Sequence, residues 1–579
     1  MDQKMFLAIG LSMVVIVAFY AIFPPPVKPP TPEPGMELTQ PGARDLQGAL
    51  SRTAAEDFAP PETVPGRAPD SSLTEATAKI VTVETPNYLA SFDTRGGTLK
   101  SFQLKKYRAG MERINWGDVI PPLRKYLDKY EVDPEARVEM VKKDLVATEP
   151  FGLWFVENGQ LTSELAHVVY AADSESIVLK AGDAPATLVL RGRTSDGVTV
   201  VKSITFGPDD YLLDYEVSVI NYSDTYQELR TRHLFGEGAQ PSGTESSYQA
   251  HWGPIYQADD SVETEDPEDV QQLFIVRDAG WVGITDTYFL SAVKNESTVS
   301  YSFYKSEPNP VVGAEPEWIA HYGVELPAVS LAPNKQITSH FKMFLGPKKT
   351  EEMEKFGEGL EGALDLGVLE IISKPMLAML RWFYGYTGNF GVAIILLTIV
   401  VRVALFPLTY KGMASMKRMQ KLQPKMKAIR EKFKKDKERL NKEMMLLYKR
   451  GKVNPLGGCL PLLLQMPIFF ALYWALSGAI ELRHSPFIFW VTDLSAPDGL
   501  YVTPILMGIT MMAQQKLTPT TPDPMQARIM MWMPAIFTVF MLQFPAGLTT
   551  YWLTSNLLSI VQQLVINRIK VADPTELPA

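Results

Sequence analysis

The sequence predicts a multi-span α-helical membrane protein with six spans, a large all-β sandwich domain outside the membrane and a helical hairpin in the cytoplasm. Three observations predict this. Six apolar stretches approach the ~20 residues that cross a ~30 Å hydrocarbon layer. Short β-type runs fill the segment between the first two, and a strongly basic segment separates the second from the third. The average composition, 46% apolar with a net charge of −9, hides these unlike regions.

Residues 1–23 are predicted to be a transmembrane anchor. The run from Met5 to Phe23 is uncharged over 19 residues. A cleaved signal peptide is the alternative, but its apolar region is usually about 7–15 residues long and ends in small residues. Here aromatic and branched side chains continue up to Pro24. Residues 24–78 hold twelve prolines, and such a composition buries too little apolar surface to offset the entropy of ordering. We expect a disordered linker there.

The stretch 79–348 is predicted to form a β-sandwich. Runs rich in Val, Ile, Thr, Tyr and Phe recur between turn residues, and many of them alternate apolar with polar side chains. Many short alternating strands are typical of an antiparallel sandwich. Strands are predicted at 79–84, 186–191, 198–206, 211–220 and 298–303.

Residues 349–385 are predicted to form helices outside the membrane and at its surface. A helical pattern covers 349–364. The stretch 366–384 then mixes large apolar side chains with three charged residues and contains Pro375, which is typical of a helix that lies in the interface rather than crossing. Residues 386–570 are predicted to form a five-span core. Its spans are expected at about 390–409, 458–480, 501–517, 529–544 and 547–566.

The basic segment 411–452 sets the orientation. It carries 16 Lys or Arg residues against four acidic residues, and cytoplasmic segments carry the Lys and Arg excess. Alternation across six spans then places 79–348 outside and both chain ends inside, including the tail 571–579. The same charge suits anionic lipid, so the pattern leaves a ribosome contact open. No direct contact with nucleic acid is expected.

Apolar residues in this segment recur every three or four positions and predict a helical hairpin. The first stripe includes Met413, Met416 and Met419, beside the cations Lys417 and Arg418. A second stripe follows within 440–447, and the two stripes are expected to pack on each other. Methionine adapts to irregular partners, so a surplus Met-rich face could also receive apolar segments of another chain.

Arg402 is the most unusual residue of the core. It lies nine residues before Lys411, which is about 13 Å along a helix and therefore within the cytoplasmic half of the bilayer. An arginine at depth costs at least ~2.5–3.5 kcal/mol, and the other five predicted spans contain no acidic partner. Snorkelling is the alternative. Thr398, Gln465 and the hydroxyl-rich sixth span could line a wet recess, although each residue taken singly suits ordinary interhelical hydrogen bonding.

The sequence lacks the motifs that are typical of nucleotide-binding proteins and of zinc proteases. The sequence contains neither GxxxxGK[ST] nor HExxH, and no GxGxxG follows a predicted strand. The single cysteine, Cys459, excludes an internal disulfide and multi-cysteine metal sites. The six histidines are scattered rather than paired at ligand spacing. We expect no cofactor, no metal and no hydrolytic enzyme.

The predicted core resembles the YidC/Oxa family of membrane protein insertases. The run Asn454-Pro-Leu-Gly-Gly-Cys-Leu-Pro-Leu-Leu-Leu-Gln-Met-Pro-Ile-Phe-Phe-Ala-Leu-Tyr473 is similar to the family's signature span. The stretch 92–102 resembles the periplasmic domain of Gram-negative members, which is a β-supersandwich. Further matches in the family's order are 402–409, 422–425, 493–495, 504–508 and 544–548.

The resemblance implies insertion and folding of inner-membrane proteins, alone or beside the Sec translocon. Substrates would be nascent membrane proteins arriving from ribosomes, in contact with membrane lipids. The positions that match the family's hydrophilic groove are Arg402, Thr398, Gln465, Tyr551 and Trp552. We further expect apolar substrate segments to slide along span surfaces near Phe469, Phe470, Met530 and Met533.

Two other classes remain open from the residues alone. A small-solute transporter would be expected to show inverted repeats and paired broken helices, which are not evident. A sugar-modifying enzyme in the outer sandwich would need a histidine pair and an acid around a pocket.

Overall fold

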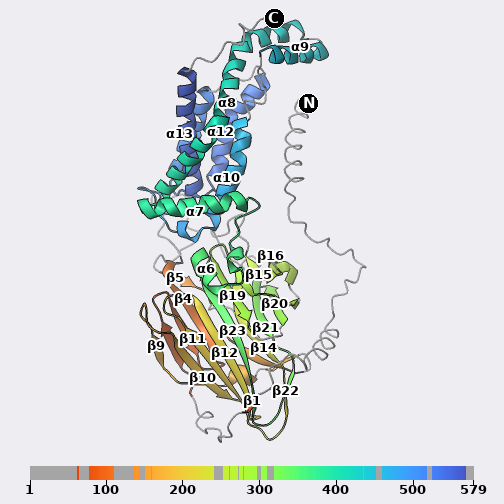
Figure 1. Cartoon of the computed structure of the whole chain (residues 1–579), viewed down its shortest axis with the longest axis vertical. Helices are drawn as coiled ribbons and strands as arrows, with labels where there is room; N and C mark the ends of the chain where they lie inside the picture. The colour runs from red at the N-terminus through yellow and green to blue at the C-terminus, as the bar shows by residue number, and fades with distance from the viewer. Residues whose placement is uncertain are drawn as a thin grey trace, which may run out of the picture.

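The computed structural model describes residues 62–63 and 77–568, with gaps inside the second range. The predicted anchor 1–23, most of the predicted linker 24–78 and the tail 571–579 lie outside the described residues. Figure 1 shows a β-rich domain at one end and a bundle of helices at the other. The gaps are 110–135, 142–149, 158–159, 163, 240–251, 260, 271–272, 278, 297–300, 309–317, 435, 452–459 and 518–523.

A large antiparallel sheet forms one layer of the β-domain. Its central strands pair in a register that places Ile204 opposite Tyr215 and Tyr215 opposite Phe341. Since side chains alternate between the two faces of a strand, this register lines up one buried row across three strands. The strands described in this sheet are β1 (Glu62–Thr63), β8 (Ala171–Ala172), β10 (Ala186–Arg193), β11 (Val198–Phe206), β12 (Leu212–Asn221), β15 (Gly253–Ala258), β16 (Ser261–Thr264), β18 (Val282–Thr285), β19 (Phe289–Asn295) and β23 (Lys335–Pro347).

Two smaller sheets and a two-stranded ribbon complete the β-domain, with α5 (Glu164–His167) and η3 (Pro267–Val270) between strands. One sheet contains β2 (Ile80–Glu84), β3 (Tyr88–Asp93), β4 (Thr98–Arg108), β5 (Arg137–Glu139) and β9 (Ser176–Val178). The other contains β6 (Leu153–Glu157), β7 (Gln160–Thr162), β14 (Thr231–Ala239), β17 (Phe274–Arg277), β20 (Tyr301–Pro308) and β21 (Trp318–Glu325), and the ribbon pairs β13 (Gln227–Leu229) with β22 (Val329–Leu331).

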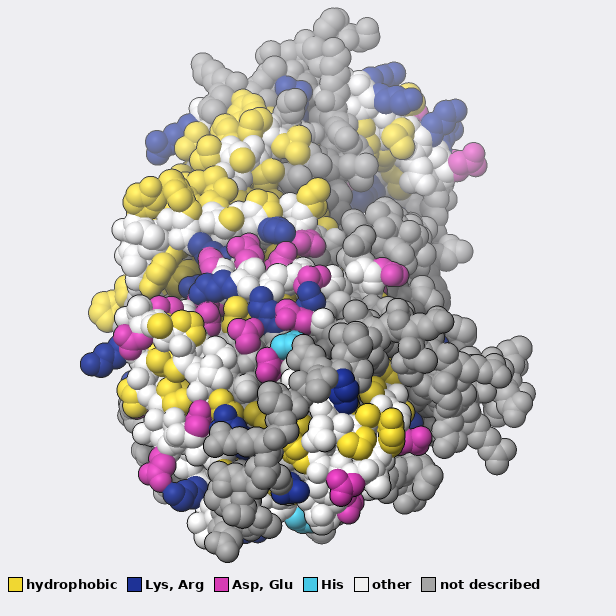
Figure 2. All heavy atoms as spheres, turned by 60° about the horizontal axis from the view of Figure 1, so that its bottom comes forward, with side chains coloured by type: hydrophobic (Ala, Val, Ile, Leu, Met, Phe, Trp, Pro, Cys, Tyr) yellow, Lys and Arg dark blue, Asp and Glu magenta, His cyan; other side chains and the backbone are white. Residues whose placement is uncertain are grey.

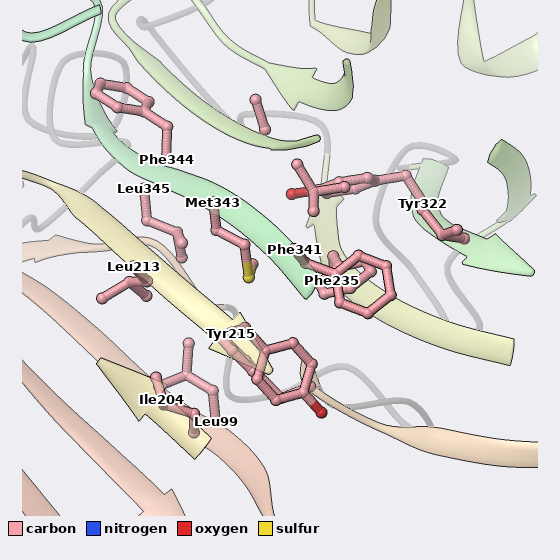
Figure 3. Packing of buried hydrophobic residues seen from close by; sticks show 14 of the residues in the cluster. Leu99, Ile204, Leu213, Tyr215, Phe235, Tyr322, Phe341, Met343, Phe344 and Leu345 are labelled. Carbon is pink, nitrogen blue, oxygen red and sulfur yellow. The ribbon is translucent and has the colours of Figure 1, made fainter. Parts of the chain in front are cut away.

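The buried core lies between the large sheet and the two smaller ones. Leu99 of β4 lies beside Ile204 of β11, and the ring of Phe235 from β14 lies 4.8 Å from that of Phe341 on β23 (Figure 3). Phe92 of β3 packs edge-on against Phe206 of β11 in the large sheet, at 5.8 Å between ring centroids. Both smaller sheets therefore pack on one face of the large sheet, which confirms the predicted sandwich.

The predicted strands match the structure closely. The segment 198–206 is β11 residue for residue, and 79–84, 186–191 and 211–220 differ from β2, β10 and β12 by one or two residues at their ends. The fifth prediction, 298–303, overlaps β20, whose first described residue is Tyr301.

Short helices join the β-domain to the bundle. They are α6 (Thr350–Phe356), η4 (Leu360–Ala363) and α7 (Glu370–Thr387), so the helical region runs two residues past the predicted boundary at 385. Figure 1 shows α7 lying across the ends of the bundle helices, between the bundle and the β-domain. Arg381 of α7 forms an ion pair of 2.7 Å with Glu481, and this pair ties α7 to the loop after the bundle's second helix.

The bundle contains α8 (Phe390–Lys432), α10 (Leu460–Gly478), α11 (Val502–Leu517), α12 (Pro524–Met541) and α13 (Ala546–Arg568), with α9 (Lys437–Arg450) and η6 (Ile480–Leu482) in its connections. Among the described helices, α8 is the one that meets a combined test of length and hydropathy for crossing a membrane. The expected total of six spans therefore stays a prediction. In Figure 2, apolar side chains gather toward the helical end, while acidic and basic side chains intermingle over the β-domain.

The predicted boundary at 411 is not a break in the structure. Helix α8 continues through it for 43 residues in all, so one helix contains both the predicted second span and the predicted first arm of the hairpin. The second arm is α9, which begins at a cap in which Asp436 accepts a hydrogen bond from the Arg439 amide. Leu422 and Met426 of α8 pack against Met444, Leu447 and Tyr448 of α9, which is the kind of contact expected between the two apolar stripes. The cytoplasmic hairpin itself stays a prediction.

Candidate functional site

Helix α8 carries Arg402 to the middle of the bundle. The helix starts at Phe390, where the Asn389 side chain accepts a hydrogen bond from the Val392 amide at 3.1 Å. Arg402 lies twelve residues further on, which is about 18 Å along a helix. If the start of α8 marks one surface of a ~30 Å hydrocarbon layer, the guanidinium lies beyond its midplane.

Arg402 has a neutral partner. Its Nε donates to Ser555 Oγ at 3.0 Å, and a second guanidinium nitrogen contacts the same oxygen. Ser555 is buried on α13, whereas Arg402 is half-buried. Within the described part of the chain, no carboxylate lies within ion-pair distance of Arg402. Five N–H donors therefore share one hydroxyl among the described residues.

Two further predicted groove residues form a pair beside this one. Gln465 of α10 donates through Nε2 to the hydroxyl of Tyr551 on α13, and Tyr551 is buried. Tyr551 and Ser555 lie four residues apart and therefore share one face of α13. Thr398 is also buried, but its hydroxyl bonds back to the Ile394 carbonyl at 2.6 Å. The structure thus brings four polar side chains together and leaves Thr398 within its own helix.

The predicted sliding surface divides into buried and exposed parts. Phe469 is buried and packs edge-on against Trp552 at 4.9 Å between ring centroids. Phe469 and Trp552 therefore pack inside the helical bundle. Phe470 and Met530 are half-buried, and Met533 is exposed. The sliding role stays a prediction for all four residues.

Much of the polar character of α13 is used between helices. Thr549 and Thr503 of α11 approach within 3.1 Å through their hydroxyls, and the Asn556 side chain donates to the Met507 carbonyl and the Thr510 hydroxyl. Thr549 and Asn556 therefore take part in interhelical hydrogen bonds, which was the alternative interpretation of the polar residues in this span.

The hairpin residues are placed unequally. Met413 is buried, and Met419 contacts the small core between α8 and α9. Lys417 donates to the carbonyl of Ile566 at 3.1 Å, near the end of α13. Arg418 is half-buried, and the side chain of Met416 lies outside the described residues.

Sequence reasoning singled out Tyr551 and Trp552 on α13 and missed the specific role of Ser555. The signal was present, because Ser555 follows Tyr551 by one helical turn in a span already rich in hydroxyl groups. The direction from which α8 meets α13 decides which hydroxyl reaches Arg402, and that direction depends on tertiary packing.

Two titratable groups of the β-domain are buried away from this site. Lys202 points into the core from β11 and donates to the carbonyls of Gly96, Gly97 and Phe151 at 2.7, 3.1 and 2.8 Å. Burial lowers the pKa of Lys202 to about 7. Burial and the nearby Lys202 lower the pKa of His233 to about 3. Among the described residues, no cluster of His, Cys, Asp and Glu is arranged to hold a metal ion.

Comparisons with known proteins agree with this architecture. A family model described as "60Kd inner membrane protein" matches residues 382–573, and one described as "YidC periplasmic domain" matches residues 123–379. A relative from Geobacter metallireducens, "Membrane protein insertase YidC", is 36% identical and the match covers 98% of each chain. A relative of the same description from Syntrophus aciditrophicus is 37% identical, over 98% of this chain and all of the relative.

A solved structure described as an active YidC insertase covers 89% of this chain and 95% of its own, with 18% identity and a TM-score of 0.36. That score is too low to add to the assignment. The fold and the sequence relatives together define an inner-membrane protein with a helical core and a periplasmic β-domain. The chain belongs to the YidC family of membrane protein insertases.

Proposed function

We propose that this chain inserts inner-membrane proteins and helps them fold, alone or with the Sec translocon, through a hydrophilic groove open to the cytoplasm and to lipid. One observation carries the proposal: Arg402, half-buried in a helix suited to crossing a membrane, has a single serine as its partner among the described residues. A cation in that position needs further solvation. Water entering from the cytoplasm would provide it.

The barrier to insertion lies in the polar part of a substrate. An arriving helix gains about 0.3–0.6 kcal/mol from each central Leu, Ile, Phe or Val once it reaches lipid, so the final state is downhill. Moving the polar or acidic stretch across hydrocarbon is the costly step. A wet groove around Arg402 would hydrate this stretch partway and attract its negative charge, which shortens the dry path.

The remaining polar groups suit the same groove. The Gln465–Tyr551 pair provides an amide and a hydroxyl one helical turn from the Arg402–Ser555 pair. Apolar substrate segments would leave toward lipid past half-buried Phe470 and exposed Met533.

Insertion in this scheme uses no hydrolytic reaction. The membrane potential contributes about 2.3 kcal/mol per charge per 100 mV, which favours outward movement of acidic segments. Nascent membrane proteins are the substrates. The ribosome would meet the basic hairpin formed by α8 and α9, whose cations also face anionic lipid.

The test replaces Arg402 in cells depleted of their own insertase. Arg402→Ala is expected to reduce insertion of a substrate with an acidic translocated tail by at least tenfold, as measured by protease protection of that tail. Arg402→Lys should restore much of it, because a cation remains. Arg191→Ala removes an exposed arginine from β10 and serves as the matched control. Unchanged insertion with Arg402→Ala would remove the guanidinium from the mechanism.

A further inference from the structure

The loop between α10 and α11 contains an apolar stretch that the proposed function does not use. Residues 486–491 read Pro-Phe-Ile-Phe-Trp-Val and carry no charge. We call this stretch the aromatic loop. Phe489 in its centre is 88% exposed and Ile488 is 43% exposed. Exposed apolar groups that lie together on a surface mark a site of contact.

We propose that the aromatic loop inserts into the outer surface of the lipid bilayer and anchors this side of the helical core. The inference concerns membrane contact and does not depend on insertion activity. It rests on how the loop is held, on where it is held and on what else is exposed beside it.

The loop is held in a fixed shape. The Phe487 amide donates to the Val491 carbonyl at 3.0 Å, and the Val491 amide donates to the Ile488 carbonyl at 2.9 Å. The Trp490 indole donates to Asp498 at 3.2 Å. These bonds hold Phe489 at a φ of 44°, a left-handed conformation that bulky residues rarely adopt. The exposed ring is therefore displayed by a rigid turn.

The loop is attached to the start of helix α8. Asn389, the residue that caps α8, donates through its side chain to the Phe487 carbonyl at 3.0 Å. The Phe487 ring presses on Gly391 so closely that a Cβ at position 391 would lie 1.9 Å from it. Since the start of α8 marks the outer end of a helix suited to crossing the membrane, the loop sits at the level of the bilayer surface.

The neighbouring exposed side chains favour lipid as the occupant. Val392, directly after Gly391, is exposed, and the ring of Tyr384 on α7 stacks on Phe390 at 3.9 Å. Trp382 and Tyr386 of α7 are also exposed. Trp and Tyr concentrate at membrane interfaces, because their rings combine an apolar body with a polar end. The aromatic loop and α7 thus both contact the first turn of α8, the loop through Phe487 and α7 through Tyr384.

Depth-dependent quenching tests this inference on the full chain in vesicles of phosphatidylcholine and phosphatidylglycerol. The only cysteine of the chain, Cys459, is replaced by serine, and Phe489→Cys is labelled with an environment-sensitive fluorophore. Nitroxide lipids labelled near the headgroup should quench this probe at least threefold more than a probe introduced by Tyr226→Cys, a control position exposed on the β-domain. Aqueous iodide should show the reverse order.

Two results would overturn the inference. A probe at position 489 quenched by iodide as strongly as the control, and not by nitroxide lipid, would place the loop in water. A probe quenched by neither reagent would mean that protein covers it, either a second copy or another partner. If the labelled Phe489→Cys chain does not reconstitute, the same measurement at Ile488→Cys decides between these outcomes.

Discussion

The β-domain and the helical core each hold a basic side chain inside the protein, and the two side chains differ in their hydrogen-bond partners. Lys202 in the β-domain is fully buried, meets three backbone carbonyls and lies 4.9 Å from the centre of the Tyr170 ring. Arg402 in the core remains half-buried and meets one serine hydroxyl among the described residues. Three acceptors match the three donors of an ammonium group, whereas one hydroxyl cannot satisfy a guanidinium.

The difference fits a structural role for Lys202 and the groove role proposed for Arg402. Lys202 links β11 to the loop after β3 and to Phe151, so its bonds hold three segments together. Gly96 and Gly97 leave room for it, since both have positive φ and a Cβ at position 97 would lie 3.3 Å from the Lys202 nitrogen. Arg402 links two helices through one weakly matched contact. A cation kept for structure is expected to be fully satisfied by protein, and one kept for solvent or substrate is not.

The largest expected effect comes from removing Lys202, whose amino group has three carbonyl partners. Lys202→Met leaves the carbonyls of Gly96, Gly97 and Phe151 buried without donors, and each orphaned group costs roughly 1–3 kcal/mol. The free energy of unfolding of the β-domain should therefore fall by about 3–5 kcal/mol. Hydrogen exchange of β11 amides in the full chain measures this. Lys79→Met, which breaks an exposed pair with Glu175, should leave the exchange of these amides essentially unchanged, because solvent screens such a pair. Similar results for the two variants would contradict a structural role for Lys202.

A second effect tests whether burial keeps the His233 ring uncharged in the folded β-domain. Its folded state holds the pKa of His233 at about 3, below the ordinary value of 6.5. The unfolded chain therefore binds the proton first, so stability is full above pH 6.5 and falls as the pH drops toward 3, by up to about 1.4 kcal/mol per pH unit. His233→Phe keeps an aromatic ring against Phe341 and removes this dependence.

The measurement for His233 is the difference in unfolding free energy between pH 6.5 and pH 4.5, which should be about 2–3 kcal/mol larger for the original chain than for His233→Phe. Carboxylates also titrate in this range, but they do so in both chains and cancel in the comparison. Parallel pH curves would show that water reaches the His233 ring.

The sequence predicted the strands of the β-domain better than it predicted which polar side chains are buried there. Alternation in 198–206 was enough to define β11. The same alternation places Lys202 in the inward row with Val200 and Ile204, yet a lysine in an apolar row is normally taken as a sign of exposure. Its acceptors come from the Gly96–Gly97 turn of another sheet and from Phe151, and that approach is not encoded locally.

In the core, the sequence predicted the unusual residue but not its surroundings. Arg402 was identifiable because a charge in an apolar run is costly wherever the run lies. Ser555 depends on how α8 and α13 cross, which no local pattern fixes. The continuity of α8 past position 411 was missed because the change from apolar to basic residues looks like a boundary, although Lys, Met and Arg are as helix-forming as Leu.

A third prediction contrasts Arg402 with Lys202 directly. Arg402→Met should change the stability of the helical core by no more than about 1 kcal/mol, or raise it, because replacing a poorly satisfied cation by an apolar side chain is often neutral or stabilising. Thermal unfolding of the full chain in detergent measures this, with insertion assayed on the same variant. Insertion should be lost although the fold is kept. A loss of several kcal/mol would instead make Arg402 a structural cation like Lys202.

The smallest expected effect concerns Ser555, the one hydrogen-bond partner of Arg402 in the part of the chain that the structure describes. Ser555→Ala removes a single hydroxyl, and if water also solvates the guanidinium, water can replace that oxygen at little cost. Stability should fall by less than about 1 kcal/mol, and insertion should stay within about twofold of the original chain. Ser559→Ala is the matched control, because Ser559 is a buried serine one turn further along α13. Among the described residues its hydroxyl bonds only within its own helix, to the Ser555 carbonyl. If Ser555→Ala abolished insertion as Arg402→Ala is expected to, the hydroxyl rather than water would be holding the arginine in place. Protein groups would then hold Arg402 as they hold Lys202, although through fewer hydrogen bonds. The groove would have to be explained without solvent.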